Sequence, residues 1–232
     1  MSHQPRYAIY YVPDAESALY RFGTALLGYD ALNAHNVAQP DALVEAIPRW
    51  REFTDDPRKY GFHATLKAPF RLSSRASETD LVAAFEEFSG KQRAIAVIRP
   101  LARLLRNFVA IVNDAPNGDL AKLADDCVTA FEVFRAPLTP QDRERRLKSP
   151  LNSNQIEMLD RWGYPYVFEE FFFHMRLTGR IESALGEQTL EVIAAQFSKL
   201  GQQSLAIDRL ALLRQDHPSA KFAAIRHLAL RR

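Results

Sequence analysis

Hydrophobic and polar positions follow two different periods along this chain of 232 residues. Short runs rich in aromatic and β-branched residues, bounded by turn residues, are typical of strands. The predicted strands are residues 6–12, the first half of 61–72 with Pro69 closing the run, 94–98, 106–114, 167–181, 205–215 and 222–230.

Apolar residues that recur every three or four positions predict the helices. The first helix follows Asp14, an N-cap residue type, and ends at Gly28. The helix at residues 77–89 begins with Ser77 and Asp80, a weaker form of the capping box. Further helices are predicted near residues 43–47 and at 117–134, 139–147, 151–163 and 187–200.

The order of these elements predicts an α+β fold. Each half of the chain contains a histidine-bearing strand followed by a helix and a pair of strands. The short turn at residues 216–219 implies antiparallel neighbours at the end of the chain. Because no linker rich in Pro, Gly or Ser interrupts the sequence, we expect a single domain over residues 1–232, made of two pseudo-symmetric lobes that share one sheet system.

Composition narrows the class of protein. Apolar residues make up 47% of the chain, and the formal net charge is only +2, so nothing in it demands nucleic acid or an anionic membrane as a partner. No apolar run is long enough to span a bilayer, and no secretory signal is recognisable. Cys127 is the single cysteine, which rules out an internal disulfide and fits a reducing cytosol. We expect a cytoplasmic protein.

Two short stretches repeat one pattern around a histidine. "FHATL" at residues 62–66 and "FHMRL" at residues 173–177 both read aromatic, His, apolar, polar, Leu. A lone histidine in an apolar strand is more often a packed core residue with one satisfied hydrogen bond. Core packing alone gives no reason to repeat the pattern, however, so the repeat favours a functional role.

In a strand, residues two apart share a face, so His63 and Thr65 point together, as do His174, Arg176 and Thr178. If both faces line one cleft, a neutral imidazole can take a proton from water while a protonated one gives a proton to a leaving oxygen. The hydroxyl and guanidinium groups suit nonbridging phosphate oxygens. The pattern predicts phosphodiester chemistry, with His63 and His174 as catalytic residues and with Thr65, Arg176 and Thr178 as phosphate ligands.

Zinc is the alternative use of two imidazoles. A zinc ion would need one or two further ligands, and neither stretch has a second His or a Cys at ligand spacing. We therefore expect no metal and no cofactor. The charged run at residues 143–147 is typical of a solvated helix face, although Lys148 beside it could border a cleft.

The strings "YGFHATLKAPFRL" and "RWGYPYVFEEFFFHMRLTGRI" resemble the two-histidine (2H) phosphoesterase superfamily, which includes RNA 2′,3′-cyclic phosphodiesterases and 2′-5′ RNA ligase-like proteins. Within it they resemble a bacterial branch of uncharacterised proteins encoded in phosphonate-utilisation operons. The similarity runs over nearly the whole chain, from residues 6–13 to residues 210–222.

The resemblance implies a bilobal, pseudo-two-fold α+β fold, with antiparallel sheets around a central cleft, and metal-free chemistry at a cyclic phosphate or phosphodiester. His63, Thr65 and His174 match the residues of the family's motifs. Arg176 stands where the second motif has a hydroxyl, and this is a departure from the family. Thr178 lies two positions further along the same face.

The leading hypothesis is a metal-independent phosphodiesterase that opens a small cyclic phosphate. The resemblance suggests a ribose cyclic phosphate from phosphonate breakdown, followed by a nucleoside 2′,3′-cyclic phosphate. Two alternatives stay open: a non-catalytic module that binds a phosphorylated or RNA ligand, and an enzyme that processes RNA ends. The chain shows no dense basic stripe interleaved with aromatic residues, which disfavours RNA. The acid and base roles of the histidines and the oligomeric state are open.

Overall fold

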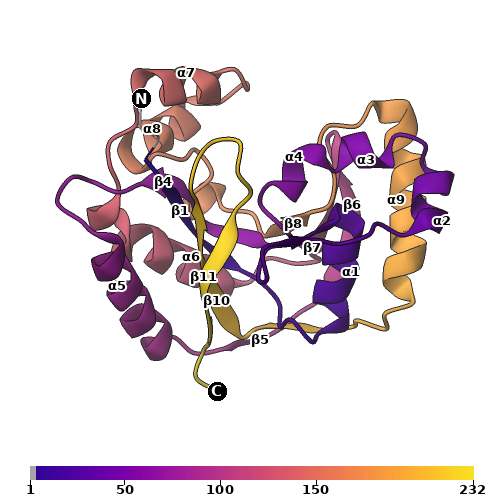
Figure 1. Ribbon diagram of the computed structural model, residues 1–232, viewed down its shortest axis with the longest axis horizontal. Coiled ribbons are helices and arrows are strands. Elements are labelled where there is room, and N and C mark those ends of the chain that lie inside the picture. The colour runs from indigo at the N-terminus through magenta and orange to yellow at the C-terminus, as the bar shows by residue number, and fades with distance from the viewer. Residues whose placement is uncertain (1–3) are drawn as a thin grey trace.

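The computed structural model describes residues 4–232, apart from the side chains of residues 96, 97 and 183. A seven-stranded antiparallel sheet runs through its centre in the order β11-β10-β1-β4-β8-β7-β6 (Figure 1). Its strands are β1 (Arg6–Tyr11), β4 (Ala64–Arg71), β6 (Pro100–Leu105), β7 (Phe108–Asn113), β8 (His174–Arg176), β10 (Arg209–Gln215) and β11 (Ala223–Ala229). Two small ladders pair β2 (Tyr29–Asp30) with β3 (His35–Asn36) and β5 (Ile95–Ile98) with β9 (Leu205–Ile207). The predicted α+β class with antiparallel strands is confirmed.

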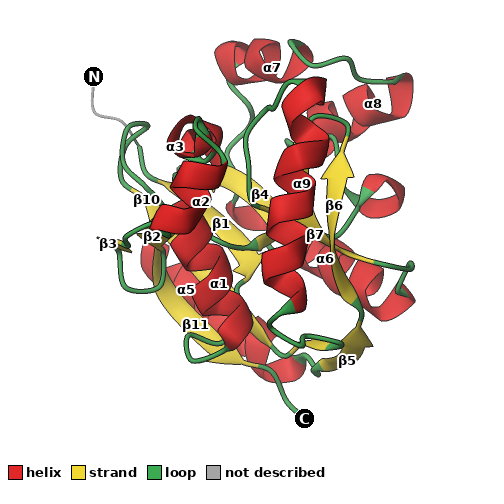
Figure 2. Cartoon of the chain, turned by 90° about the vertical axis from the view of Figure 1, so that its right-hand side faces the viewer, coloured by secondary structure: helices red, strands yellow, loops and turns green. Residues whose placement is uncertain are grey.

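Helices pack on both sides of this group of strands. They are α1 (Ala18–Leu27), α2 (Asp41–Ala46), α3 (Trp50–Phe53), α4 (Asp55–Arg58), α5 (Glu78–Lys91), α6 (Gly118–Ala130), α7 (Pro140–Leu147), α8 (Ser153–Trp162) and α9 (Ser183–Ser198). Figure 1 shows α5 and α6 on one side and α1 and α9 on the other. Figure 2 shows α1 beside α9, where Phe22 packs on Phe197. Within the described residues, none of these helices has the length and apolar character needed to cross a membrane.

Helix α1 begins later than the sequence suggests. Its N-cap is Ser17, whose hydroxyl accepts a hydrogen bond from the Tyr20 amide at 3.0 Å. Asp14 instead forms the preceding turn, because its carbonyl oxygen accepts from the Ser17 amide and hydroxyl. The predicted end is confirmed: Gly28 has a φ of 77°, a left-handed conformation that glycine adopts without steric cost.

Strand β4 continues through Pro69, which was expected to close it. The pairing of β1 with β4 shifts register between Tyr7 and Ile9, opposite Pro69. A proline is tolerated at such a bulge because the ladder needs no amide proton from it there. The bulge therefore lets β4 extend to Arg71.

The long strand expected at residues 167–181 is mostly irregular. Only His174–Arg176 pairs as β8, between β4 and β7, and Phe168–Glu170 forms a 3₁₀ turn. The Glu170 carboxylate accepts hydrogen bonds from two side chains of α8, which draws this segment away from the sheet. The sequence pattern also missed β6 and merged β9 with β10 into one strand.

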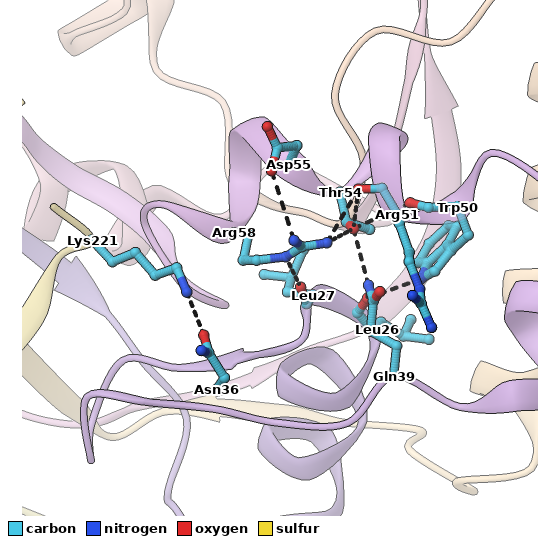
Figure 3. A network of polar contacts seen from close by, with 10 residues as sticks. All are labelled: Leu26, Leu27, Asn36, Gln39, Trp50, Arg51, Thr54, Asp55, Arg58 and Lys221. Carbon is cyan, nitrogen blue, oxygen red and sulfur yellow. Dashed lines mark hydrogen bonds and ion pairs between the residues drawn. The ribbon is translucent and has the colours of Figure 1, made fainter. Parts of the chain in front are cut away.

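A polar network fixes α3 and α4 against the end of α1 (Figure 3). The Trp50 indole donates to the Leu26 carbonyl at 3.0 Å, and Arg58 Nε donates to the Leu27 carbonyl at 2.7 Å. These carbonyls belong to the last turn of α1 and have no partner inside the helix. The buried Thr54 hydroxyl accepts from Arg58 at 2.7 Å. Helix α4 is thus held in a defined position.

Candidate active site

Strand pairing brings the two histidine stretches together. Strands β4 and β8 are antiparallel neighbours with Ala64 opposite Met175, so Thr65 lies opposite His174 and the position of His63 lies opposite Arg176. Ala64 and Met175 are 1% and 0% exposed in the core. Because side chains alternate across a strand, the four polar residues beside them share the other face. His63 itself directly precedes β4.

Both imidazole rings are oriented by the same kind of hydrogen bond. Nδ1 of His63 lies 2.9 Å from the Gly61 carbonyl oxygen, and Nδ1 of His174 lies 2.9 Å from that of Phe172. A carbonyl oxygen only accepts, so Nδ1 carries the proton in each ring. Nε2 of each histidine is therefore the atom that can exchange a proton with a ligand.

Aromatic rings surround the histidines. The Tyr10 ring stacks on His63 with centroids 3.8 Å apart, and the Phe108 ring lies 5.9 Å from His174. Phe172 is half exposed, with its ring nearly parallel to that of His174 at 6.2 Å. Desolvation penalises a charged imidazole, so this setting favours the neutral forms.

Burial lowers the pKa of His63 to about 4, against the opposing effect of the Gly61 carbonyl. Burial also lowers the pKa of His174, and the Arg176 guanidinium lowers it further. Both imidazoles are therefore neutral near pH 7 in the free protein. Among the described residues, no three His, Cys, Asp or Glu side chains are grouped so as to hold a metal ion.

Thr65 and Arg176 sit beside different histidines. The Thr65 hydroxyl lies 3.2 Å from Nε2 of His63 and, with Nδ1 protonated, donates to it. Arg176 is 31% exposed; its Nε donates to the Thr178 carbonyl at 2.7 Å, and its guanidinium lies 4.4 Å from the centre of the Phe108 ring. A carboxylate oxygen of Asp56 in α4 is 3.9 Å from Arg176 Nη1. The guanidinium is thus held in place with N–H groups to spare.

Thr178 does not join the site. Its side chain is fully buried, its hydroxyl accepts from the Val109 amide at 2.9 Å, and it donates to the Gly179 carbonyl at 3.1 Å. The expectation that Thr178 binds phosphate is wrong in this structure. Strand β8 ends at Arg176, so the alternation that would have kept Thr178 on the same face does not continue.

Two further residues near the site escaped the sequence analysis. The Arg146 guanidinium of α7 lies 4.8 Å from the centre of the Tyr164 ring, and Tyr164 follows α8. Arg146 belongs to the charged run that suggested a solvated helix face. Lys148, for which the sequence left a place at a cleft open, lines an opening beside Arg71 and Arg145. No periodicity in the sequence relates α7 to the histidine strands, so only the packing of α7 reveals the connection.

The fold and the site define a class: an antiparallel α+β protein with one imidazole directly before β4 and a second imidazole and an arginine on the neighbouring β8. The chain belongs to the family described as "Protein of unknown function (DUF1045)", which matches residues 65–223. This match confirms the resemblance to a branch of uncharacterised proteins.

Two relatives are each named "Ribose 1,5-bisphosphate phosphokinase PhnN". The protein from Janthinobacterium sp. (strain Marseille) is 37% identical over 223 residues, which is 94% of this chain and 49% of the relative. The protein from Laribacter hongkongensis (strain HLHK9) is 30% identical over 221 residues, 95% of this chain and 51% of the relative. The chain spans about half the length of these relatives.

Two solved structures align over 99% of this chain and 100% of their own. They are E. coli LigT complexed with 3′-AMP, with a TM-score of 0.41 and 14% identity, and a protein described as a phosphoesterase, with a TM-score of 0.41 and 13% identity. These values are too low to carry an argument about function.

Proposed function

We propose that the protein is a metal-independent phosphodiesterase that hydrolyses a small cyclic phosphate between His63 and His174. The observation that carries the proposal is the matched pair of imidazoles, one directly before β4 and one in the neighbouring β8, each with Nδ1 hydrogen-bonded to a carbonyl oxygen so that Nε2 is the nitrogen that exchanges a proton. Paired proton transfer by two positioned histidines is sufficient for phosphodiester hydrolysis, and a metal is not needed for it.

The proposed roles follow from the different surroundings of the two rings. His63, with a pKa near 4, is the base: its Nε2 takes a proton from the water whose oxygen attacks phosphorus. His174 is the acid: once protonated, it donates from Nε2 to the ring oxygen as the P–O bond breaks. The product is a phosphomonoester with a free hydroxyl. A bound phosphate anion beside His174 raises its pKa and so favours the protonated form that this step needs.

Thr65 and Arg176 hold the phosphate in this proposal. The Thr65 hydroxyl, now 3.2 Å from His63 Nε2, turns to a nonbridging oxygen when the substrate arrives. The Arg176 guanidinium supplies a fixed cation next to His174, which stabilises the charge that builds up on the nonbridging oxygens. A threonine at position 176 would contribute a hydrogen bond without that charge.

A ribose cyclic phosphate is the first candidate substrate. The names of the two relatives support a ribose phosphate, because this chain matches about half of proteins named for a ribose bisphosphate. The second candidate is a nucleoside 2′,3′-cyclic phosphate. Phe172, 50% exposed and nearly parallel to the His174 ring, offers a flat surface on which a base could stack.

The test is hydrolysis of a panel of cyclic phosphates by the wild type and by His63→Ala and His174→Ala, with and without a chelator. Each variant should lose activity by about 10²- to 10⁴-fold, as expected for a lost general acid or base. His35→Ala, an exposed histidine in β3, is the matched control. Thermal unfolding of each variant separates lost chemistry from lost folding.

Three results would contradict the proposal. Wild-type turnover in either variant would remove that histidine from the mechanism. Loss of activity with chelator, restored by zinc, would show that the reaction uses a metal. Binding of cyclic phosphates without any turnover would favour the non-catalytic module.

A further inference from the structure

A pocket lies near the histidine site, between β4, the segment after α6, and the α7–α8 region. Asp142 is the one carboxylate among its described lining residues. Six lining residues are cationic: Arg6, Lys67, Arg71, Arg135, Arg145 and Arg146. None of the proposed catalytic residues lines this pocket.

Two carboxylates serve four of these cations. Asp142 pairs with Arg71 and, at 2.9 Å, with Arg145. Glu132 does not line the pocket itself but pairs with two lining residues, Lys67 at 3.0 Å and Arg135 at 2.5 Å. The local excess of positive charge is larger than the net charge of +2 carried by the whole chain. The charge therefore favours an anion in this pocket.

Arg6 and Arg146 have no carboxylate within 4.0 Å among residues 4–232, yet both are held in position. Arg6 donates from Nε to the Gln215 side chain at 2.8 Å and lies over the Phe222 ring at 5.6 Å. Arg146 lies over the Tyr164 ring at 4.8 Å. A guanidinium held by stacking keeps N–H groups available, and its planar fork suits phosphate.

Tyr164 and strand β1 place the pocket near the histidine site. Tyr164 lines the pocket; burial raises its pKa, while the guanidiniums of Arg146 and Arg176 both act in the opposite direction, so both lie within electrostatic reach of its hydroxyl. On β1, Arg6 is four positions from Tyr10, the residue stacked on His63. At about 3.3 Å per residue, the Cα atoms of Arg6 and Tyr10 lie about 13 Å apart. One phosphate is too small to contact both Arg6 and the His63 ring that stacks on Tyr10.

We propose that this pocket binds a second phosphate ester of the substrate, carried on another hydroxyl of the molecule whose cyclic phosphate lies between His63 and His174. The inference rests on the proposed phosphodiesterase function. It identifies the substrate class as a sugar cyclic phosphate with an additional phosphomonoester. Arg146 and Arg6 contact that phosphomonoester, and neither takes part in proton transfer.

The test is Arg146→Gln, assayed on a sugar cyclic phosphate with and without the second phosphate. A hydrogen bond to a charged group contributes about 1.5–3 kcal/mol, so kcat/KM for the doubly phosphorylated substrate should fall by about 10- to 100-fold. For the other substrate it should hardly change. Arg143→Gln, on the same helix but paired with Asp160 at the surface, removes the same charge and should leave both rates as they are.

Calorimetry with inorganic phosphate separates the pocket from the chemistry. His174→Ala should keep a phosphate site that Arg146→Gln loses. Equal losses on both substrates, or phosphate binding unaffected by Arg146→Gln, would overturn the inference. Stimulation of the singly phosphorylated substrate by free phosphate, without preference for the doubly phosphorylated one, would assign the pocket to a separate anion and overturn it too. If phosphate binds in an Arg146-dependent way but no cyclic phosphate is turned over, the proposed phosphodiesterase function would be wrong while the phosphate site would stand.

Discussion

At the scale of single residues, the two histidines share one orientation and differ in their neighbours. Each ring donates a hydrogen bond from Nδ1–H to the carbonyl oxygen two residues earlier, which fixes the direction of Nε2. His63 has the neutral Thr65 hydroxyl beside it, whereas His174 has the Arg176 cation. Arg176 opposes protonation of His174, so a bound phosphate anion has to offset this cation before His174 can act as the proposed acid.

The pH dependence of kcat/KM tests this asymmetry. The proposed mechanism needs one neutral and one protonated imidazole in the free protein, so the profile should be bell-shaped. Because burial lowers both pKa values, the optimum should lie below pH 6.5, with an acid limb near pH 4. The two limbs belong to the coupled pair.

Arg176→Gln should move the alkaline limb of that profile to higher pH. The cation lowers the pKa of His174, so its removal lets that pKa rise. The measurement is kcat/KM from pH 4 to pH 9 for both proteins on one cyclic phosphate. An alkaline limb that stays in place would mean that Arg176 does not act on the titrating group.

At the scale of elements, β4 contributes Thr65 to the site and the buried Lys67 to the protein interior. Its pairing with β1 shifts register between Thr65, opposite Tyr10, and Lys67, opposite Ile9. The extra residue turns the Lys67 side chain away from the site and into the protein, where its ammonium donates to the Val128 carbonyl of α6 and to Glu132. Lys67 is 3% exposed, so Glu132 compensates a buried charge.

Removing Glu132 from its buried pair with Lys67 should destabilise the folded protein. We expect Glu132→Ala to lower the free energy of unfolding by about 3 kcal/mol, because it leaves Lys67 charged and uncompensated. Lys67→Met, which removes the charge and keeps an apolar chain of similar size, should cost much less. Urea denaturation measures both, with Glu87→Ala as the control, since its pair with Lys91 is exposed and contributes little. Equal losses in the first two variants would contradict this account.

At the scale of the whole molecule, the site exists only in the assembled sheet. Strand β8 is three residues long and pairs with β4 on one side and β7 on the other. A strand of three residues has little stability on its own. The position of His174 therefore depends on the two neighbouring strands and the packing around them. The same packing partly buries the His63 ring and lowers its pKa, so this histidine is neutral at pH 7.

This burial makes stability depend on pH. The pKa of His63 is about 4 in the folded protein and near 6.5 when unfolded, so the unfolded state binds more protons between these values. Stability should be intact above pH 6.5 and fall as the pH drops towards 4. The His63→Gln variant lacks this titrating group. Between pH 7 and pH 4.5 its free energy of unfolding should therefore fall by roughly 2.5 kcal/mol less than that of the wild type. Urea denaturation at both pH values measures the difference; parallel losses would show that His63 titrates normally in the fold.

By itself the sequence determined the features that depend on neighbours along the chain. The aromatic and β-branched composition of β1, the capping box at Ser77 and the helical periods of α6 and α8 were all predictable, because they are local. So was the repeated histidine pattern, which placed His63 beside Thr65 and His174 beside Arg176.

Only the tertiary structure decided what depends on contacts between distant segments. The register of β4 against β8 puts Thr65 opposite His174, and the end of β8 at Arg176 buries Thr178, which the local alternation had assigned to the site. The cationic pocket joins Arg6 to Arg146, residues that no sequence period relates. Strand register and burial are properties of paired and packed surfaces, so a one-dimensional pattern can propose a site but cannot complete it.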